Sequence, residues 1–101
     1  MADGMLAREI DGACIERRLD GATLVFQRWA DVWMIDRLPD LDDEGDPGAS
    51  TAVTRDALAA ADRVGLMALH DRQLRRLGLP RKGDGAAVLW RLVSEFDSFV
   101  P

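Results

Sequence analysis

Apolar residues in the second half of the chain recur every three or four positions, which is the period of an α-helix. One stripe runs through residues 51–64, and a second runs through residues 66–77 and stops before Gly78 and Pro80. Glycine just after a helix and proline soon after it are end signals, because glycine adopts left-handed backbone angles freely and proline cannot continue the helix. Residues 85–99 carry a third stripe, so two or three C-terminal helices are predicted. The apolar face of the last one would be Val88, Leu89, Leu92, Val93, Phe96 and Phe99.

Polar residues at the starts of these stripes support the helical interpretation. Ser50, Thr51 and Thr54 all suit the N-cap of the first helix, since their hydroxyls can accept hydrogen bonds from the free amides of a first turn. Asp84 would cap the last helix in the same way. Gly65 lies between the first two stripes and would break or bend the helix there.

Residues 14–38 fit two patterns. In the strand pattern, residues 14–19 and 22–27 flank Asp20-Gly21, a dipeptide typical of two-residue hairpin turns. A four-residue loop would then lead to a third strand at residues 32–38. In the helical pattern, residues 22–33 form one amphipathic helix.

The two patterns differ in what they expose. The helix leaves Leu24, Met34 and Ile35 on the polar side, whereas the strands leave only Arg17 and Arg37 on the apolar face. We therefore expect a hairpin or three-stranded meander, with the helix as the alternative. The expected pairs are Leu19 with Ala22, Arg17 with Leu24 and Ile15 with Phe26, then Trp33 with Phe26 and Ile35 with Leu24 across the second turn.

The predicted fold is a single α+β domain covering residues 1–101. The hairpin or meander of residues 14–38 packs on the C-terminal helices, and a short helix at residues 5–14 precedes it. The acidic, proline- and glycine-containing segment 39–50 is expected as a linker inside the domain. A chain of 101 residues suits one domain with one core. An all-α helical bundle is the alternative.

Charge is sorted along the chain. Residues 1–62 carry six arginines against fourteen acidic residues, residues 63–91 carry seven cations against two acidic residues, and the whole chain has a net charge of −5. A chain with an acidic front and a basic back can fold one end against the other or present two surfaces of opposite charge to partners. The overall negative charge argues against a protein that coats nucleic acid.

Composition excludes several classes of protein. The apolar fraction of 48% and the charged fraction of 31% are typical of a globular chain rather than a disordered one. Cys14 is the single cysteine, so no internal disulfide can form and a reducing cytoplasm is the expected location. The most apolar stretch, residues 24–35, is too short and too polar to cross a membrane, and the start lacks the pattern of a signal peptide. Twelve arginines to one lysine indicate a GC-rich bacterial or phage genome.

The cations of residues 72–82 are candidate contact residues. Arg72, Arg75 and Arg76 would share the solvent face of the second helix, beside two more cations in the following loop. Two helices joined by a turn suggest DNA binding, but the connection at residues 78–85 is longer than the three or four residues of a helix-turn-helix. We therefore favour a protein contact, and a nucleic-acid-binding regulator is the alternative.

The loop residues Arg81, Lys82 and Gly83 form a candidate anion-binding site. Backbone amides at a glycine, the positive end of a helix and two cations can together hold a phosphate. The Gly-Lys-Ser/Thr ending of a P-loop is absent, and Asp84 would repel an anion. A connection between two helices explains the same residues without a ligand.

The segment 39–50 resembles the start of an EF-hand calcium loop, in which acidic residues alternate and a glycine stands at position 6. Position 12, which supplies a bidentate glutamate in that motif, is Thr51 here, and Pro47 interrupts the loop. We therefore expect a solvated linker and no metal. The residues that carry the resemblance are Asp40, Asp42, Glu44, Gly45 and Asp46.

Residues 68–89 resemble the closing half of a sterile alpha motif domain, a helical protein-interaction module. The matching positions are Leu74, Leu77, Gly78, Leu79 and Leu89. The first half of such a domain has no counterpart in residues 20–64. The resemblance implies protein interaction rather than catalysis.

The side chains that carry chemistry do not form a recognisable catalytic set. His70 and Cys14 are each the single residue of their type, so neither a nucleophile–base pair nor a transition-metal site is indicated. Trp29 and Trp33 are the candidate aromatic contacts, because exposed tryptophans often anchor protein interfaces. We expect a non-enzymatic cytoplasmic protein without cofactor, membrane association or small-molecule substrate. It would act by binding another protein or itself, as an adaptor, chaperone or inhibitor, or as a homo-oligomer.

Overall fold

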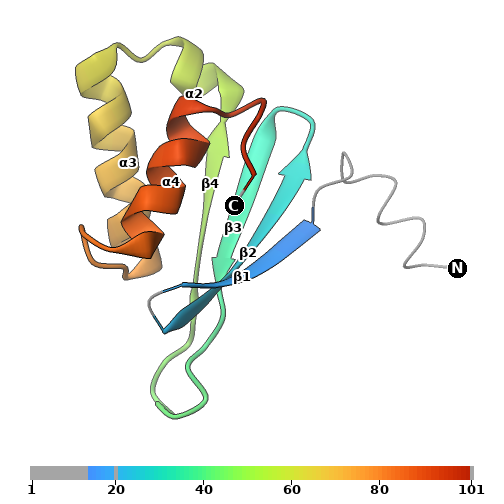
Figure 1. The fold of residues 1–101 in the computed structure, drawn as a ribbon, viewed down its shortest axis with the longest axis vertical. Helices are drawn as coiled ribbons and strands as arrows, with labels where there is room; N and C mark the ends of the chain where they lie inside the picture. Colours follow the sequence, from blue (N-terminus) through green and yellow to red (C-terminus); the bar gives the residue numbers. More distant parts are fainter. Residues whose placement is uncertain (1–13, 20, 101) are drawn as a thin grey trace, which may run out of the picture.

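The computed structural model describes residues 14–19 and 21–100. Four strands form one antiparallel sheet in the order β1-β2-β3-β4, and three helices follow (Figure 1). The α+β prediction is therefore confirmed, and the all-α alternative is wrong. The predicted N-terminal helix lies outside the described residues except for Cys14, which begins β1. The strands are β1 Cys14–Leu19, β2 Ala22–Trp29, β3 Val32–Arg37 and β4 Ala49–Thr54, and the helices are α2 Arg55–Ala59, α3 Arg63–Leu77 and α4 Asp84–Ser94.

The first hairpin has the predicted register. Leu19 pairs with Ala22 and Ile15 with Phe26. The second turn is shorter than predicted, because β2 continues to Trp29 and pairs it with Val32. Phe26 therefore pairs with Ile35 and not with Trp33. The shift is two residues, and side chains alternate with a period of two, so every residue stays on the predicted face.

The predicted helix at residues 51–64 is wrong in its first part. Residues 49–54 form β4, which pairs with β3 at the edge of the sheet, and helix follows only from Arg55. The β-branched residues of this segment fit a pleated strand better than a helix. Thr54 does act as an N-cap, since its hydroxyl accepts from the amide of Ala57 in α2. The predicted linker correspondingly ends at residue 48.

The later helices begin and end near their predicted positions. α3 starts after the N-cap Asp62 and contains Gly65. The interruption between α2 and α3 therefore lies before this glycine and not at it. It ends at Gly78, whose φ of 68° is left-handed as the end signal predicts. α4 starts after Gly83, which takes the N-cap position expected for Asp84, and it stops at Ser94 instead of residue 99.

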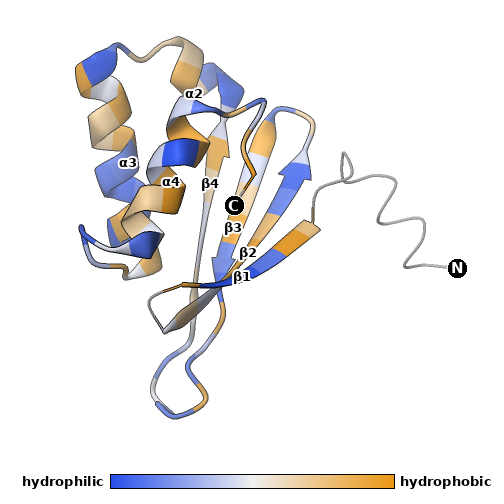
Figure 2. Ribbon diagram, in the orientation of Figure 1, coloured by the Kyte–Doolittle hydropathy of each residue, from blue (hydrophilic) through white to orange (hydrophobic). Residues whose placement is uncertain are grey.

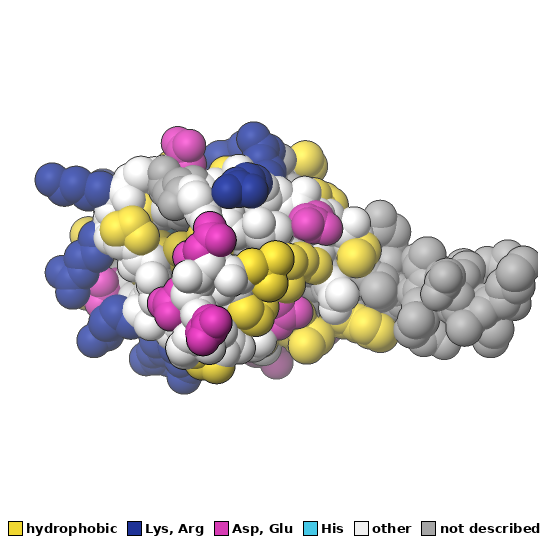
Figure 3. All heavy atoms as spheres, turned by 90° about the horizontal axis from the view of Figure 1, so that it is seen from below, with side chains coloured by type: hydrophobic (Ala, Val, Ile, Leu, Met, Phe, Trp, Pro, Cys, Tyr) yellow, Lys and Arg dark blue, Asp and Glu magenta, His cyan; other side chains and the backbone are white. Residues whose placement is uncertain are grey.

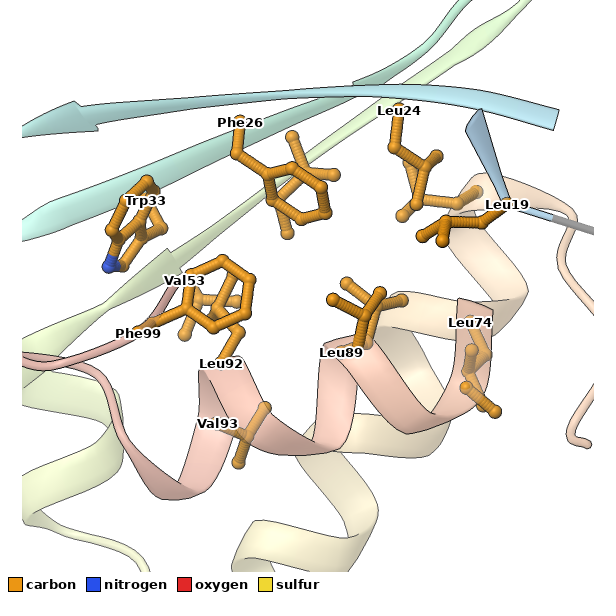
Figure 4. Packing of buried hydrophobic residues seen from close by; sticks show 14 of the residues in the cluster. Leu19, Leu24, Phe26, Trp33, Val53, Leu74, Leu89, Leu92, Val93 and Phe99 are labelled. Atoms are coloured by element: carbon orange, nitrogen blue, oxygen red, sulfur yellow. The ribbon is translucent and has the colours of Figure 1, made fainter. Parts of the chain in front are cut away.

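The core lies between one face of the sheet and the helices α3 and α4 (Figure 4). Figure 2 shows that apolar residues concentrate in the central strands and α4, whereas the β3–β4 loop is largely polar. All six residues of the predicted apolar face at residues 88–99 are buried. The core residues are Leu19, Leu24, Phe26, Trp33, Ile35, Val53, Leu74, Leu77, Ala86, Val88, Leu89, Leu92, Val93, Phe96 and Phe99.

The segment after α4 is tied to the sheet. The backbone carbonyl of Phe96 accepts from the indole Nε1 of Trp33 at 2.9 Å and from the Arg28 guanidinium at 3.0 Å. Asp97 pairs with Arg55 and with Arg28, and these cations hold the pKa of its carboxyl below the usual range. The chain thus continues to pack on the sheet although the helix has ended.

The strand pattern left two arginines, Arg17 and Arg37, on the apolar face, and the structure accommodates them in different ways. Arg17 lies on β1, an edge strand, and is exposed. Arg37 donates from Nε to the carbonyl of Leu77 at 2.6 Å, which satisfies an acceptor at the end of α3. Its other two nitrogens hold Asp46 at 2.7 and 2.9 Å. Arg37 therefore joins the sheet, the end of α3 and the β3–β4 loop.

None of the helices in residues 14–19 and 21–100 has the length and apolar character that crossing a bilayer requires.

Candidate protein-interaction surfaces

The second face of the sheet is not covered by another layer within the described ranges. The side chains that alternate with the core positions are exposed or half-buried on every strand. All the helices follow the sheet in sequence, and α3 and α4 pack on the opposite face (Figures 1 and 4). We call the uncovered side the open face. It carries Cys14, Glu16, Arg18, Thr23, Val25, Gln27, Trp29, Val32, Met34, Asp36, Ser50, Ala52 and Thr54.

The open face is apolar at one end and charged at the other. Near the β2–β3 turn, Trp29 pairs with Val32, and in the next row across the sheet Met34 lies between Gln27 and Ala52. Met34 is 41% exposed although it lies in the middle of β3. The other end carries Glu16, Arg18 and Asp36, and Asp36 accepts a hydrogen bond from Ser50. An apolar patch with a polar border is the usual pattern of a protein interface.

Trp29 occupies the apolar end of the open face. Its indole Nε1 is buried but has no hydrogen-bond partner in the described part of the chain. A buried polar group without a partner is costly, so this indole N–H reduces the stability of the fold. Trp33, the second aromatic residue predicted at an interface, is 2% exposed and belongs to the core. We therefore reassign Trp33 from the interface to the core.

The predicted basic residues lie on the outer side of α3 and in the loop after it. Arg72, Arg75 and Arg76 are exposed, as are both loop cations. Asp71 lies between Arg75 and Arg81 and pairs with each at 3.1 Å. Figure 3 shows dark-blue side chains along the α3 side of the molecule and near the upper edge of the view, whereas several magenta ones lie toward the β3–β4 loop.

The predicted anion-binding residues Arg81, Lys82 and Gly83 lie in the connection that leads into α4. Gly83 caps α4 without a side-chain hydrogen bond. The Arg81 guanidinium pairs with Asp71 on α3 and so contributes less to a site at the start of α4. Lys82 is exposed. Anion binding by these residues stays a prediction.

A hollow between α3 and α4 is a surface that the sequence did not indicate. It has a volume of about 440 Å³ and is lined by Arg63, Met67, His70, Asp71, Leu74, Arg81 and Trp90. His70 in this lining joins α3 to α4. Its ring contacts Trp90 edge-on with a centroid distance of 5.4 Å, and its Nε2 donates to the carbonyl of Ala86 at 2.8 Å. Met67 is 58% exposed beside it. The spacing of residues along the chain gave no signal for it, because the hollow depends on how α3 and α4 meet. We call this hollow the α3–α4 groove.

The β3–β4 loop is held at its base by Asp46. In addition to Arg37, this carboxylate accepts from the backbone amides of Asp40 and Gly48 at 2.8 and 2.9 Å. The hydrogen bonds from Arg37 are the main cause of a pKa for Asp46 far below the usual range. Asp46, which stands at position 7 of the calcium-loop resemblance, is thus already hydrogen-bonded to an arginine. No group of three or more potential metal ligands occurs among residues 14–19 and 21–100.

Comparisons with known proteins found no matching family model, no similar curated protein and no similar solved structure. The resemblance to a sterile alpha motif domain does not extend to the fold, because a four-stranded sheet precedes the helices that carry it. The physical surfaces of the molecule are therefore the basis for assigning a function.

Proposed function

We propose that this protein is a non-enzymatic interaction module that binds another protein through the open face of its sheet. The observation that carries the proposal is the apolar end of that face, where Trp29, Val32 and Met34 lie together with no layer over them in the described residues. Burying apolar area of this kind on association is favourable by about 25 cal/mol for each Å² removed from water.

The chemistry of the open face indicates the kind of partner. An apolar surface on the partner should meet Trp29 and Met34. The charged end, with Glu16, Arg18 and Asp36, would set the orientation of the partner rather than the affinity. Binding a partner protein in this way would suit an adaptor, a chaperone or an inhibitor. Cys14 on the same face would stay reduced in the cytoplasm, where we place the protein.

Catalysis is not part of this proposal. The groups whose pKa values are shifted lie in the ion pairs Arg37–Asp46 and Arg55–Asp97, which hold the loop and the C-terminal segment in place. Such pairs shift pKa values for structural reasons as well as functional ones. In this chain the structural role accounts for them.

The proposal is tested by comparing which proteins co-purify with three forms of the chain. Met34→Glu places a charge at the centre of the open face, whereas Val100→Glu places the same charge at a residue that is 60% exposed and outside that face. We expect a partner that is retained by the wild type and by Val100→Glu but lost with Met34→Glu. The same partners on all three forms would contradict the proposal, provided that circular dichroism shows all three folded.

A further inference from the structure

The lining of the α3–α4 groove combines apolar and positively charged side chains. Met67, Leu74 and Trp90 supply apolar atoms, and Arg63 and Arg81 supply positive charge. Asp71 is the acidic residue of the lining, and it is already paired with two arginines. The groove therefore suits an apolar side chain that is flanked by carboxylates. Its volume of about 440 Å³ lies within the range of ~300–1,000 Å³ typical of ligand pockets.

The β3–β4 loop presents such a side chain. Leu41 is 94% exposed, which places nearly the whole side chain in water. The residues around it in the sequence are Asp40, Asp42, Asp43 and Glu44. An exposed leucine among four carboxylates is complementary to the groove in both hydrophobicity and charge.

The loop is fixed in a position that points away from the groove of its own molecule. Arg37 and the backbone amides of Asp40 and Gly48 hold both oxygens of Asp46, and short turns centred on Asp40 and Asp43 order the tip. The loop projects below the sheet, whereas the groove lies between the two helices (Figure 1). Contact between the two surfaces therefore requires a second molecule.

We propose that the Leu41 loop of one copy of this chain docks in the α3–α4 groove of a second copy. The two contacting surfaces differ, so a pair of molecules joined by one contact keeps one free loop and one free groove. Such a head-to-tail contact can extend into a chain or close into a ring. This inference is independent of the open face, which it leaves available to a different partner.

The experiment measures mass against protein concentration by sedimentation velocity, at about 0.05 M and about 0.5 M salt, since surface charge attraction is strongly screened at the higher value. The wild type is expected to form dimers and larger species that increase with concentration and shrink with salt. Leu41→Asp removes the apolar anchor and Met67→Glu repels the acidic loop, so each variant alone should stay monomeric. Both residues are exposed, so neither change disturbs the core.

Mixing the two variants gives the decisive result. Met67→Glu keeps its loop and Leu41→Asp keeps its groove, so one productive contact is possible in the mixture. A 1:1 complex that does not grow further is expected. Val100→Glu serves as the charge control and should assemble like the wild type.

Several results would overturn the inference: a wild type that is monomeric at every concentration, assembly that is equal at both salt concentrations, or variants that assemble normally. Failure of the mixture to form a 1:1 complex would also overturn it. Loss of assembly in Met34→Glu with retention in Leu41→Asp would assign self-association to the open face instead. That outcome would support the proposed function of the open face while rejecting the loop–groove contact.

Discussion

Replacing Phe99 by alanine tests whether the segment after α4 is part of the core. Phe99 is buried, although it lies five residues beyond the end of the last helix. Its ring meets Trp33 edge-on at a centroid distance of 5.2 Å and is tilted against Phe26 at 5.3 Å. Phe99→Ala would remove both contacts and leave a cavity between the sheet and α4.

The expected cost follows from the burial of this ring. Substitutions of this kind destabilise a protein by about 3–5 kcal/mol, which is a large part of the ~5–15 kcal/mol that holds a typical domain together. The melting temperature should fall by at least ~12 °C, since a domain of this size loses ~4–8 °C per kcal/mol.

The assay is urea denaturation followed by tryptophan fluorescence and by far-UV circular dichroism. Val100→Ala is the matched control at the adjacent, exposed position, and we expect it to change stability by less than about 0.5 kcal/mol. A loss of less than about 1 kcal/mol for Phe99→Ala would refute the reasoning, because the segment could not then be packed as described.

Three further predictions concern the loop, the ion pairs and the open face. Gly48→Ala should destabilise the fold by about 1–3 kcal/mol in thermal melts. The reason is that Gly48 has a φ of 75° and that a Cβ there would lie 2.8 Å from the Arg37 carbonyl oxygen. Gly45→Ala is the control and should be nearly neutral, because there is space for a Cβ at that position. Asp46 and Asp97 have folded pKa values below the unfolded value of about 3.9, so the stability they provide is full above that pH and is lost as the pH falls through the folded values. Asp46→Asn should therefore flatten the acid limb of a stability-against-pH curve, and an unchanged limb would contradict the ion pair. Trp29→Phe should cost less than about 1 kcal/mol in urea denaturation, because it also removes an N–H that has no partner among the described residues, but it should weaken partner binding. A stability loss above about 3 kcal/mol would contradict this reasoning.

Local signals in the sequence were sufficient for much of the fold. The dipeptide Asp20-Gly21 predicted the register of the first hairpin, because a two-residue turn leaves one pairing, and Leu19 does pair with Ala22. Gly78 and Pro80 marked the end of α3 for equally local reasons. The apolar face of residues 88–99 was also predictable, although its last residues pack without being helical.

The errors arose where tertiary contacts decide the structure. Residues 49–54 carry one large apolar side chain, Val53, so their alternation was too weak to indicate a strand, and their hydroxyls suggested helix caps. Pairing with β3 and the hydrogen bond from Thr51 to Gln73 on α3 stabilise them as a strand instead. Trp33 was placed at an interface because the sequence does not reveal that its indole N–H has a partner in the carbonyl of Phe96.

The candidate surfaces were less predictable than the fold. The acidic β3–β4 loop and the exposed arginines of α3 followed directly from the order of charges. The position of the open face depends on which side of the sheet the helices cover, and the groove depends on how α3 and α4 pack together. Neither arrangement is set by the spacing of residues along the chain.

Site-specific photo-crosslinking tests the central claim most directly. A photo-reactive residue is placed at Met34 on the open face and, as a control, at Val100, which is also exposed. We predict that the Met34 probe forms a covalent adduct with a separate protein and that the Val100 probe does not. Equal adducts at the two positions, or a Met34 probe that reacts only within its own chain, would contradict the claim that the open face binds a partner.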